Sequence, residues 1–176
     1  AIGADGMFTG VISKEPVRAL NDERVRSMDL GGGNGCALTT EGDLYCWGTN
    51  DGGQLLGNEI HTEFHGPRRI ASNPDWKQVT AGSSICVLRL EGGVECWGAN
   101  NGGCLGRGQS QSELRYSQDI ATVISDDEFD DLVGSTFSYV GRTTQGELRS
   151  WGRDTYGKMG NGQTGDQSLP GTINID

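Results

Sequence analysis

The sequence predicts an all-β fold built from three copies of one repeat, and three observations lead to this prediction. First, tryptophans recur at Trp47, Trp97 and Trp151, which lie 50 and then 54 residues apart. Second, glycine supplies 30 of the 176 residues, and a Gly stands five residues before, one after and six after each of these tryptophans. Third, no long stretch shows the apolar period of about 3.6 residues that marks a helix. Self-similarity at a period of about 50 residues is typical of folds in which each repeat is one supersecondary unit.

Each copy opens with a short apolar strand that ends in glycine, at residues 25–31, 76–82 and 129–134. A hairpin is expected next. A three-residue turn needs a left-handed conformation at its last residue, and Gly42 supplies it in the loop Thr40-Glu41-Gly42. Gly92 and Gly146 hold the same position in the other copies. The residues beside these turns are β-branched, aromatic or aliphatic, as expected for short strands.

The repeated strings carry a recognisable pattern. Residues 36–57 read CALTTEGDLYCWGTNDGGQLLG, and residues 86–106 read CVLRLEGGVECWGANNGGCLG. Residues 140–160, VGRTTQGELRSWGRDTYGKMG, keep the Gly-Trp-Gly frame but lack both cysteines. Over about residues 15–173 the sequence resembles the repeat of the regulator of chromosome condensation family. The resemblance implies a β-propeller in which each copy is a four-stranded blade, but it says little about function, because one fold hosts many activities.

We therefore expect a single repeat domain over residues 1–176, with blades at approximately 15–70, 71–123 and 124–176. Residues 1–10 are expected to end a further repeat, and residues 15–20 to form a lead-in strand. Complete propellers of the family resemble rings of about seven blades, and propellers in general close with about four to eight. Three blades leave a partial, open propeller with two exposed sheet edges, which invite pairing. Three explanations stay open: a fragment of a longer protein, a ring formed by oligomerisation, and docking against a protein partner that covers the edges.

Four of the five cysteines form two pairs with a spacing of ten, Cys36 with Cys46 and Cys86 with Cys96. Counting outward from the turn places each pair at opposite, non-hydrogen-bonded positions, where the Cα atoms lie about 4.5 Å apart and a disulfide fits. We expect two disulfides. The alternatives are four buried reduced thiols or, with less support, a zinc site.

The third copy has Val140 and Ser150 in place of the two cysteines, and loss of both together is what a disulfide predicts. Disulfides imply an oxidising compartment: the extracellular space, a periplasm, or an organelle lumen such as that of the thylakoid. The fifth cysteine, Cys104, takes the place of Gln54 and Lys158, which are polar, so we expect a partly exposed free thiol.

Charge and motifs argue against several functions. The net charge is −10, and no cluster of basic residues offers a surface for nucleic-acid phosphates. No apolar run approaches the length of a transmembrane segment. The sequence has no nucleophile elbow, and its only histidines, His61 and His65, lie in one loop for which a plain surface role is favoured over a metal site. The string from Gly152 to Lys158 spells GxxxxGK, but Met159 replaces the Ser or Thr of a P-loop. We expect no catalysis, cofactor or metal.

The sharpest charge run is DDEFDD, for which a solvated loop is favoured over an acidic patch for a partner or a calcium site. Two aromatic residues, Phe64 and Tyr116, have no assigned place in the repeat core. The candidate partner-binding residues are therefore Asp126, Asp127, Glu128, Asp130, Asp131, Phe64 and Tyr116.

These observations favour a non-catalytic protein-interaction module, an accessory or structural subunit of a larger assembly. One alternative is a secreted enzyme inhibitor of the propeller type, similar to β-lactamase inhibitors that present aromatic residues on one rim. Another is a fragment of a longer propeller similar to an exchange factor.

Overall fold

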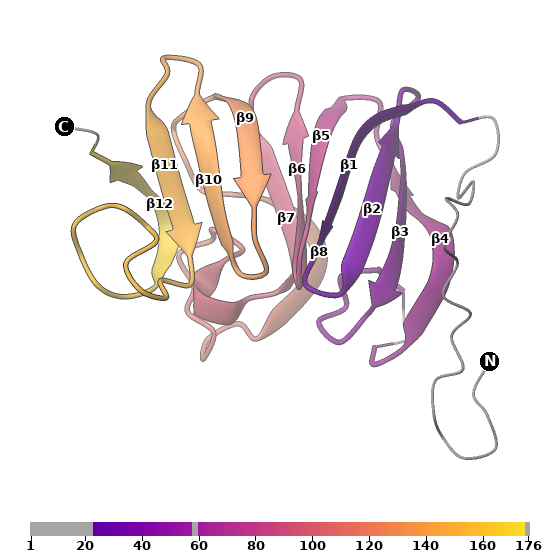
Figure 1. Cartoon of the computed structure of the whole chain (residues 1–176), viewed down its shortest axis with the longest axis horizontal. Coiled ribbons are helices and arrows are strands. Elements are labelled where there is room, and N and C mark those ends of the chain that lie inside the picture. Colours follow the sequence, from indigo (N-terminus) through magenta and orange to yellow (C-terminus); the bar gives the residue numbers. More distant parts are fainter. Residues whose placement is uncertain (1–22, 58–59, 175–176) are drawn as a thin grey trace, which may run out of the picture.

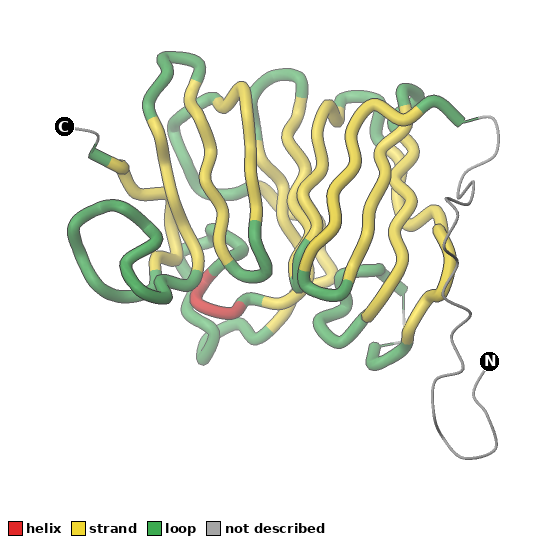
Figure 2. The backbone as a smooth tube through the Cα atoms, in the orientation of Figure 1, coloured by secondary structure: helices red, strands yellow, loops and turns green. Residues whose placement is uncertain are grey.

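The computed structural model describes residues 23–57 and 60–174. Within them, three four-stranded antiparallel sheets stand side by side, and each is made of four strands that follow one another in the sequence (Figure 1). The one helical segment in these ranges is the short 3-10 turn η1 (Asn101–Gly103) (Figure 2). The fold is the all-β partial propeller that the sequence predicts, and each sheet is one blade. No helix in the described ranges has the length and apolar character needed to cross a bilayer.

The blades follow the order of the chain. The first contains β1 (Val25–Gly31), β2 (Asn34–Thr39), β3 (Asp43–Thr49) and β4 (Glu63–Ser72). The second contains β5 (Trp76–Ala81), β6 (Ser84–Arg89), β7 (Val94–Ala99) and β8 (Tyr116–Thr122). The third contains β9 (Phe129–Gly134), β10 (Ser138–Thr143), β11 (Leu148–Gly152) and β12 (Gln167–Ile173).

The opening strands agree with the sequence-based prediction, except that β5 ends at Ala81, one residue early. The expected repeat end at residues 1–10 and the lead-in strand at 15–20 lie outside the described residues. The hairpin turns also form as predicted. Gly42 has a φ of 90°, and its N–H donates to the carbonyl oxygen of Thr39 at 3.1 Å. Gly92 and Gly146 have φ angles of 94° and 86°.

Neighbouring blades pack face to face, so each blade has two faces that we name by chain direction. The leading face is turned toward the preceding blade, and the trailing face toward the following blade. The two hydrophobic clusters each combine the trailing face of one blade with the leading face of the next. The core of the molecule therefore lies between blades, because a thin sheet buries its side chains only against a neighbour.

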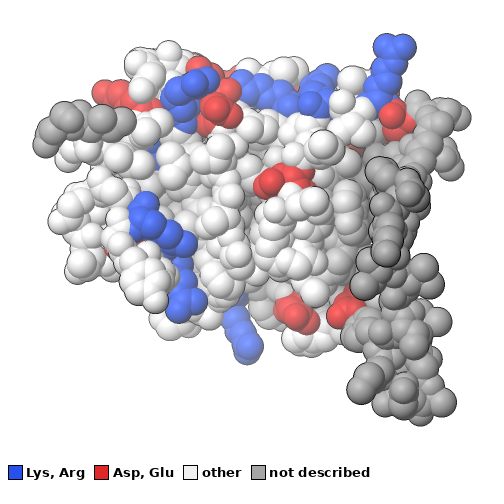
Figure 3. Space-filling view, viewed as in Figure 1, with Lys and Arg blue, Asp and Glu red and all other residues white. Residues whose placement is uncertain are grey.

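This arrangement corrects one expectation. The ends of an open arc were expected to be sheet edges, but they are sheet faces, because the blades stack through side chains and form three separate sheets. What a partner would have to cover is the leading face of the first blade or the trailing face of the third. At the rim formed by the hairpin turns, acidic and basic side chains gather, whereas the middle of the viewed surface is mostly uncharged (Figure 3).

Candidate protein-interaction faces

The leading face is made from equivalent positions in every blade, as the strand registers show. In the second blade, six apolar side chains of this face are at most 2% exposed: Trp76, Val79, Ala81, Ile85, Val87 and Trp97. In the third blade, the large side chains of this face are equally buried: Phe129, Leu132, Tyr139 and Trp151. Both sets pack against the blade before them.

The first blade exposes the first-strand positions of this face, whereas Gly35 and Ala37 on its second strand are buried and Trp47 is half-buried. Its leading face holds Val25, Met28, Leu30, Gly35, Ala37 and Trp47. Val25 is 43% exposed, Met28 78% and Leu30 75%. Single exposed apolar side chains are normal on protein surfaces, but contiguous exposed apolar patches mark interaction sites. The first strand of this blade thus presents apolar side chains to solvent where the second blade buries Trp76, Val79 and Ala81.

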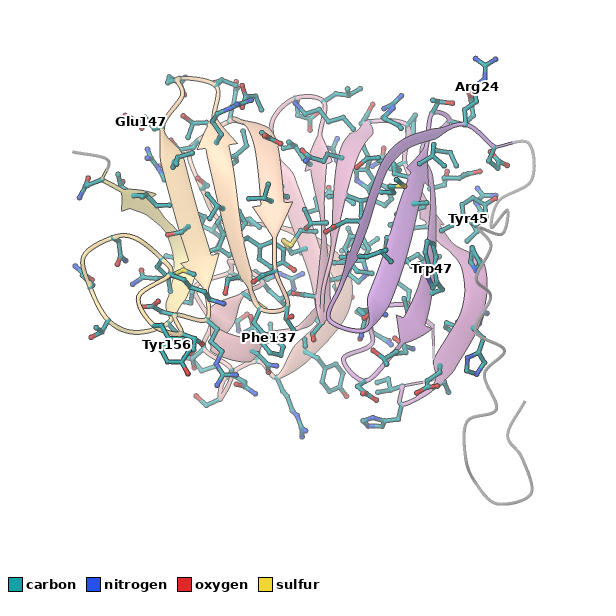
Figure 4. All side chains as sticks on the ribbon, in the orientation of Figure 1. Arg24, Tyr45, Trp47, Phe137, Glu147 and Tyr156 are labelled. Carbon is teal, nitrogen blue, oxygen red and sulfur yellow. A yellow bond between two sulfur atoms is a disulfide. The ribbon has the colours of Figure 1, made fainter. Side chains whose placement is uncertain are left out.

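The tryptophans differ in the same way. The indole N–H of Trp97 donates to the carbonyl oxygen of Gln54 in the preceding blade at 2.8 Å, and that of Trp151 donates to the carbonyl oxygen of Cys104 at 3.1 Å. Trp47 is half-buried, and its indole N–H has no hydrogen-bond acceptor among the described residues. Figure 4 shows Trp47, with Tyr45, on the side of the first blade that is turned away from the other blades. Trp47 therefore differs from Trp97 and Trp151, which are fully buried.

The sizes of the two residues in one cross-strand pair determine the surface shape of each leading face. The pairs are Ala81 with Ile85 and Gly134 with Tyr139, each a small residue on the first strand opposite a large one on the second. The first blade reverses the sizes, with Leu30 opposite Gly35. A Cβ at Gly35 would lie 2.4 Å from the Trp47 ring and 2.7 Å from Leu30, so both side chains rest on this glycine. Leu30 and Trp47 then border a shallow groove that runs along the glycine-rich turn between β1 and β2.

The trailing face carries the cystines. Cys36 is joined to Cys46 and Cys86 to Cys96, as predicted, with Cα–Cα distances of 4.2 Å in both bridges. All four residues are fully buried at the interfaces between blades.

The trailing face of the third blade carries a charged side chain where the trailing faces of the first two blades carry leucine. Leu38 and Leu88, both fully buried in the first two blades, are replaced by Arg142, whose side chain is half exposed. Its Nε donates to a carboxylate oxygen of Asp130 at 2.7 Å, and this hydrogen bond raises the pKa of the guanidinium. Asp130 itself occupies the strand-bulge position that holds basic residues in the other blades, Arg26 and Lys77.

The acidic run does not act as one patch. Arg149 binds Asp127 through two nitrogens, at 2.8 and 3.2 Å, and Asp131 accepts a hydrogen bond from Gln78 at 3.1 Å. With Asp130 bound to Arg142, three of the five carboxylates have partners within the chain. The two that face solvent are Asp126 and Glu128.

The two unassigned aromatic residues lie on the outer strands of different blades. Phe64 on β4 is half-buried against the first interface cluster, with the Arg68 guanidinium 4.7 Å above its ring. Tyr116 on β8 is 42% exposed. The structure therefore leaves one of the pair in solvent. The HxxxH segment is not helical either: His61 lies in a turn and contacts Asp51 at 3.3 Å, while His65 is part of β4.

Cys104 is a free thiol, but its expected partial exposure is wrong, because the side chain is fully buried between the second and third blades. Its Sγ lies 3.3 Å from the hydroxyl of Ser84 and 3.1 Å from the carbonyl oxygen of Ala99. Tyr139 contacts the same hydroxyl at 2.7 Å. Burial raises the pKa of the thiol to about 11. Such a thiol is structural and unreactive at neutral pH.

Sequence reasoning missed the exposed apolar residues of the first blade, Met28 and Leu30 above all. A signal for them exists in the repeat alignment. Their counterparts in the second copy, Val79 and Ala81, are core residues that need a preceding blade. Within the described residues, no blade lies against those positions in the first copy.

Comparison with known proteins agrees with this architecture. The sequence model of the Regulator of chromosome condensation (RCC1) repeat matches residues 41–88, and a second model of the same repeat matches residues 25–54. No curated protein sequence matches the chain. The resemblance to the RCC1 repeat family is thus present in the sequence of the first two blades.

Solved structures share the fold over the whole arc. Human WBSCR16 matches with a TM-score of 0.75 and 23% identity over 87% of this chain and 40% of its own. Prp20p from Saccharomyces cerevisiae matches with a TM-score of 0.74 and 18% identity over 86% of this chain and 39% of its own. A structure of Kap60 bound to yeast RCC1 (Prp20) gives a TM-score of 0.74 and 17% identity over 90% of this chain and 39% of the matched chain. The chain spans about 40% of the length of these structures.

Proposed function

We propose that this chain is a non-catalytic protein-interaction module that acts as a subunit of a larger assembly, in which a partner protein covers the leading face of the first blade. One observation carries the proposal. Met28 and Leu30 are 78% and 75% exposed, whereas their second-blade counterparts, Val79 and Ala81, are each 2% exposed. Water contact at such a surface is unfavourable by about 25 cal/mol per Å² of apolar area, so its burial drives association.

The reactive side chains of the described residues support a role without catalysis. Cys104 is buried with a raised pKa, and Tyr139 and Ser84 are bound to each other beside it. Three arginines near the hairpin turns, Arg89, Arg142 and Arg149, are bound to carboxylates. Groups engaged in this way hold the blades together and are not poised for chemistry.

The two cystines support an oxidising compartment, which we include in the proposal. Disulfides persist in extracellular, periplasmic and lumenal proteins and are rare where thiols are kept reduced. Both bridges are fully buried at blade interfaces, where reductants reach them only when the blades separate.

A second candidate is an exchange-factor-like fragment. Prp20p, whose fold this chain matches, has binding properties to Gsp1p and histones. The fold match favours a related role for this chain as part of a longer propeller. Such binding would use the rims, where Asp126, Glu128 and Tyr116 remain candidate contacts. An inhibitor role has less support, because Phe64 is packed and only Tyr116 of the aromatic pair is exposed.

A comparison of two charge substitutions tests the proposal. Leu30→Glu places a carboxylate on the leading face of the first blade, and Val133→Glu places one on the trailing face of the third, where Val133 is 58% exposed. Each tagged variant is recovered from its native source, and native mass spectrometry measures the bound partner. We expect the wild-type chain and Val133→Glu to retain the partner, and Leu30→Glu to lose it. Retention by all three would refute a role for the leading face.

A further inference from the structure

The two interfaces inside the chain show what a leading face accepts. In each, the preceding blade offers a cystine, a leucine, and a second aliphatic residue from the third strand. These are Cys36–Cys46 with Leu38 and Leu44, and Cys86–Cys96 with Leu88 and Val94. Each preceding blade also turns one loop carbonyl oxygen toward the indole N–H of the following tryptophan. The same apolar surface and the same carbonyl therefore recur in both interfaces.

The leading face of the first blade shares the tryptophan and the apolar character of these interfaces, although Leu30 and Gly35 reverse the sizes of the cross-strand pair. Trp47 occupies the position of Trp97 and Trp151, and its indole N–H lacks an acceptor within the described ranges. Leu30 and Met28 supply the apolar surface around it. The blade that fits here offers a carbonyl oxygen at the position of Gln54 and an apolar trailing face.

The chain's own third blade does not meet that description. Arg142 stands where the accepting blades have leucine, and Val140 and Ser150 stand where they have a cystine. Docking this face would take the Arg142–Asp130 pair out of water, and the desolvation of a buried ion pair offsets much of its attraction. The pair forms within one blade, so it places charge on a face that also carries the apolar residues Val133, Val140 and Leu148.

We propose that the leading face of the first blade binds a blade of the same repeat type carried by a separate protein, and that the Arg142–Asp130 pair keeps a second copy of this chain from taking that place. The partner blade presents an apolar, cystine-bearing trailing face, and its loop carbonyl accepts the indole N–H of Trp47. This inference rests on the proposed function and specifies the partner of the same face.

The test uses a probe made from the full chain. Its trailing face is converted to that of the first two blades, and its own leading face is blocked so that it cannot self-associate. The substitutions are Asp130→Lys, Val140→Cys, Arg142→Leu and Ser150→Cys, with Leu30→Glu as the block. The control probe carries Leu30→Glu alone. Circular dichroism and a thiol count confirm that each probe is folded and that the new cystine is closed.

Sedimentation velocity measures binding of each probe to the wild-type chain. We expect the converted probe to form a 1:1 complex at least about tenfold tighter than the control probe, because a leucine replaces an ion pair that must be desolvated. A target with Trp47→Phe keeps an aromatic ring, although a smaller one, but loses the indole N–H, and should bind about three- to tenfold more weakly. Equal binding of the two probes would overturn the inference. Self-association of the wild-type chain that Leu30→Glu abolishes would also overturn it, because a second copy of the chain would then occupy the leading face.

The two proposals fail in different ways. If Leu30→Glu loses its native partner but the converted probe does not bind, the leading face is an interaction site for a protein of another kind, and this inference alone falls. If Leu30→Glu also keeps its native partner, both proposals fall.

Discussion

The indole nitrogen of Trp97 lies 2.8 Å from the carbonyl oxygen of Gln54, and this hydrogen bond joins the second blade to the first. Trp97 is fully buried. The contact recurs between Trp151 and Cys104 at the next interface. Trp97 and Trp151 thus each join their blade to the preceding one by a hydrogen bond while contributing a large buried surface.

Replacing Trp97 with Phe should therefore lower the free energy of unfolding by about 1–3 kcal/mol, because the buried carbonyl of Gln54 loses its donor. The same substitution at Trp47, which donates no hydrogen bond within the described residues, should cost less than about 0.5 kcal/mol. Urea unfolding followed by circular dichroism measures both. Equal losses at the two positions would contradict the role assigned to the indole N–H.

The turn glycines allow a second matched comparison. Gly42 and Gly146 have φ angles of 90° and 86° at equivalent positions. A Cβ at Gly42 would lie 2.4 Å from the carbonyl oxygen of Asn73, whereas a Cβ at Gly146 has nothing within 4 Å. Gly146→Ala should cost about 1–2 kcal/mol for the left-handed backbone alone. Gly42→Ala should cost clearly more, because the chain entering the next blade must move. Thermal unfolding of the two variants measures the difference, and identical melting temperatures would refute this reading of the crowding.

The third blade should accept the disulfide it lacks. Val140 and Ser150 are paired across β10 and β11, as Cys36 and Cys46 are across β2 and β3. The double variant Val140→Cys, Ser150→Cys should therefore close a third bridge. On the chain-entropy account, a loop of about eleven residues contributes about 2.8 kcal/mol.

The net gain should be smaller, because the Ser150 hydroxyl donates to the carbonyl oxygen of Met159 at 2.7 Å and that hydrogen bond is lost. A thiol assay under denaturing conditions should find one free thiol, that of Cys104, and unfolding with and without reductant measures the stabilisation. Three free thiols would show that the pair cannot close.

Stability should fall at alkaline pH because of Cys104. Its pKa is raised from 9.0 to about 11 by burial, so the folded chain keeps a proton that the unfolded chain releases. Between about pH 9 and 11 the unfolded state binds fewer protons, and the free energy of unfolding decreases as the pH rises. By pH 10.5 the loss from this thiol is about 2 kcal/mol.

Burial also raises the pKa of Tyr139, which adds to the loss above about pH 10. Cys104→Ala should therefore flatten the pH dependence without abolishing it. The comparison is between the slopes of unfolding free energy against pH for the two proteins. Parallel slopes would mean that the thiol does not titrate as described.

Much of the fold is predictable from the sequence because its signals are local. A glycine such as Gly42 specifies a turn, the turn specifies the strand register, and the register brings Cys36 opposite Cys46. The spacing of the tryptophans then gives the number of blades. Each of these steps uses residues close together in the chain.

The interaction face is not predictable in the same way, because it depends on what lies beside each blade. Cys104 replaces the polar Gln54, which suggests exposure, yet both side chains are buried under the tryptophan of the next blade. Trp47 has the same local sequence as Trp97, but no blade covers it within the described residues. Exposure in a stacked fold is a property of position in the stack.

The charge pair on the third blade has a consequence for stoichiometry. In the proposed arrangement, one end of the chain binds a partner blade, and the Arg142–Asp130 pair at the other end disfavours binding of a second copy. At any concentration, one copy of the chain should bind to a partner end, and no further copy should bind to that first copy. Titration against such a partner should therefore saturate at one copy per partner end and produce neither filaments nor turbidity, whereas removal of the Arg142–Asp130 pair would give an open-ended head-to-tail contact of the kind that generates fibres.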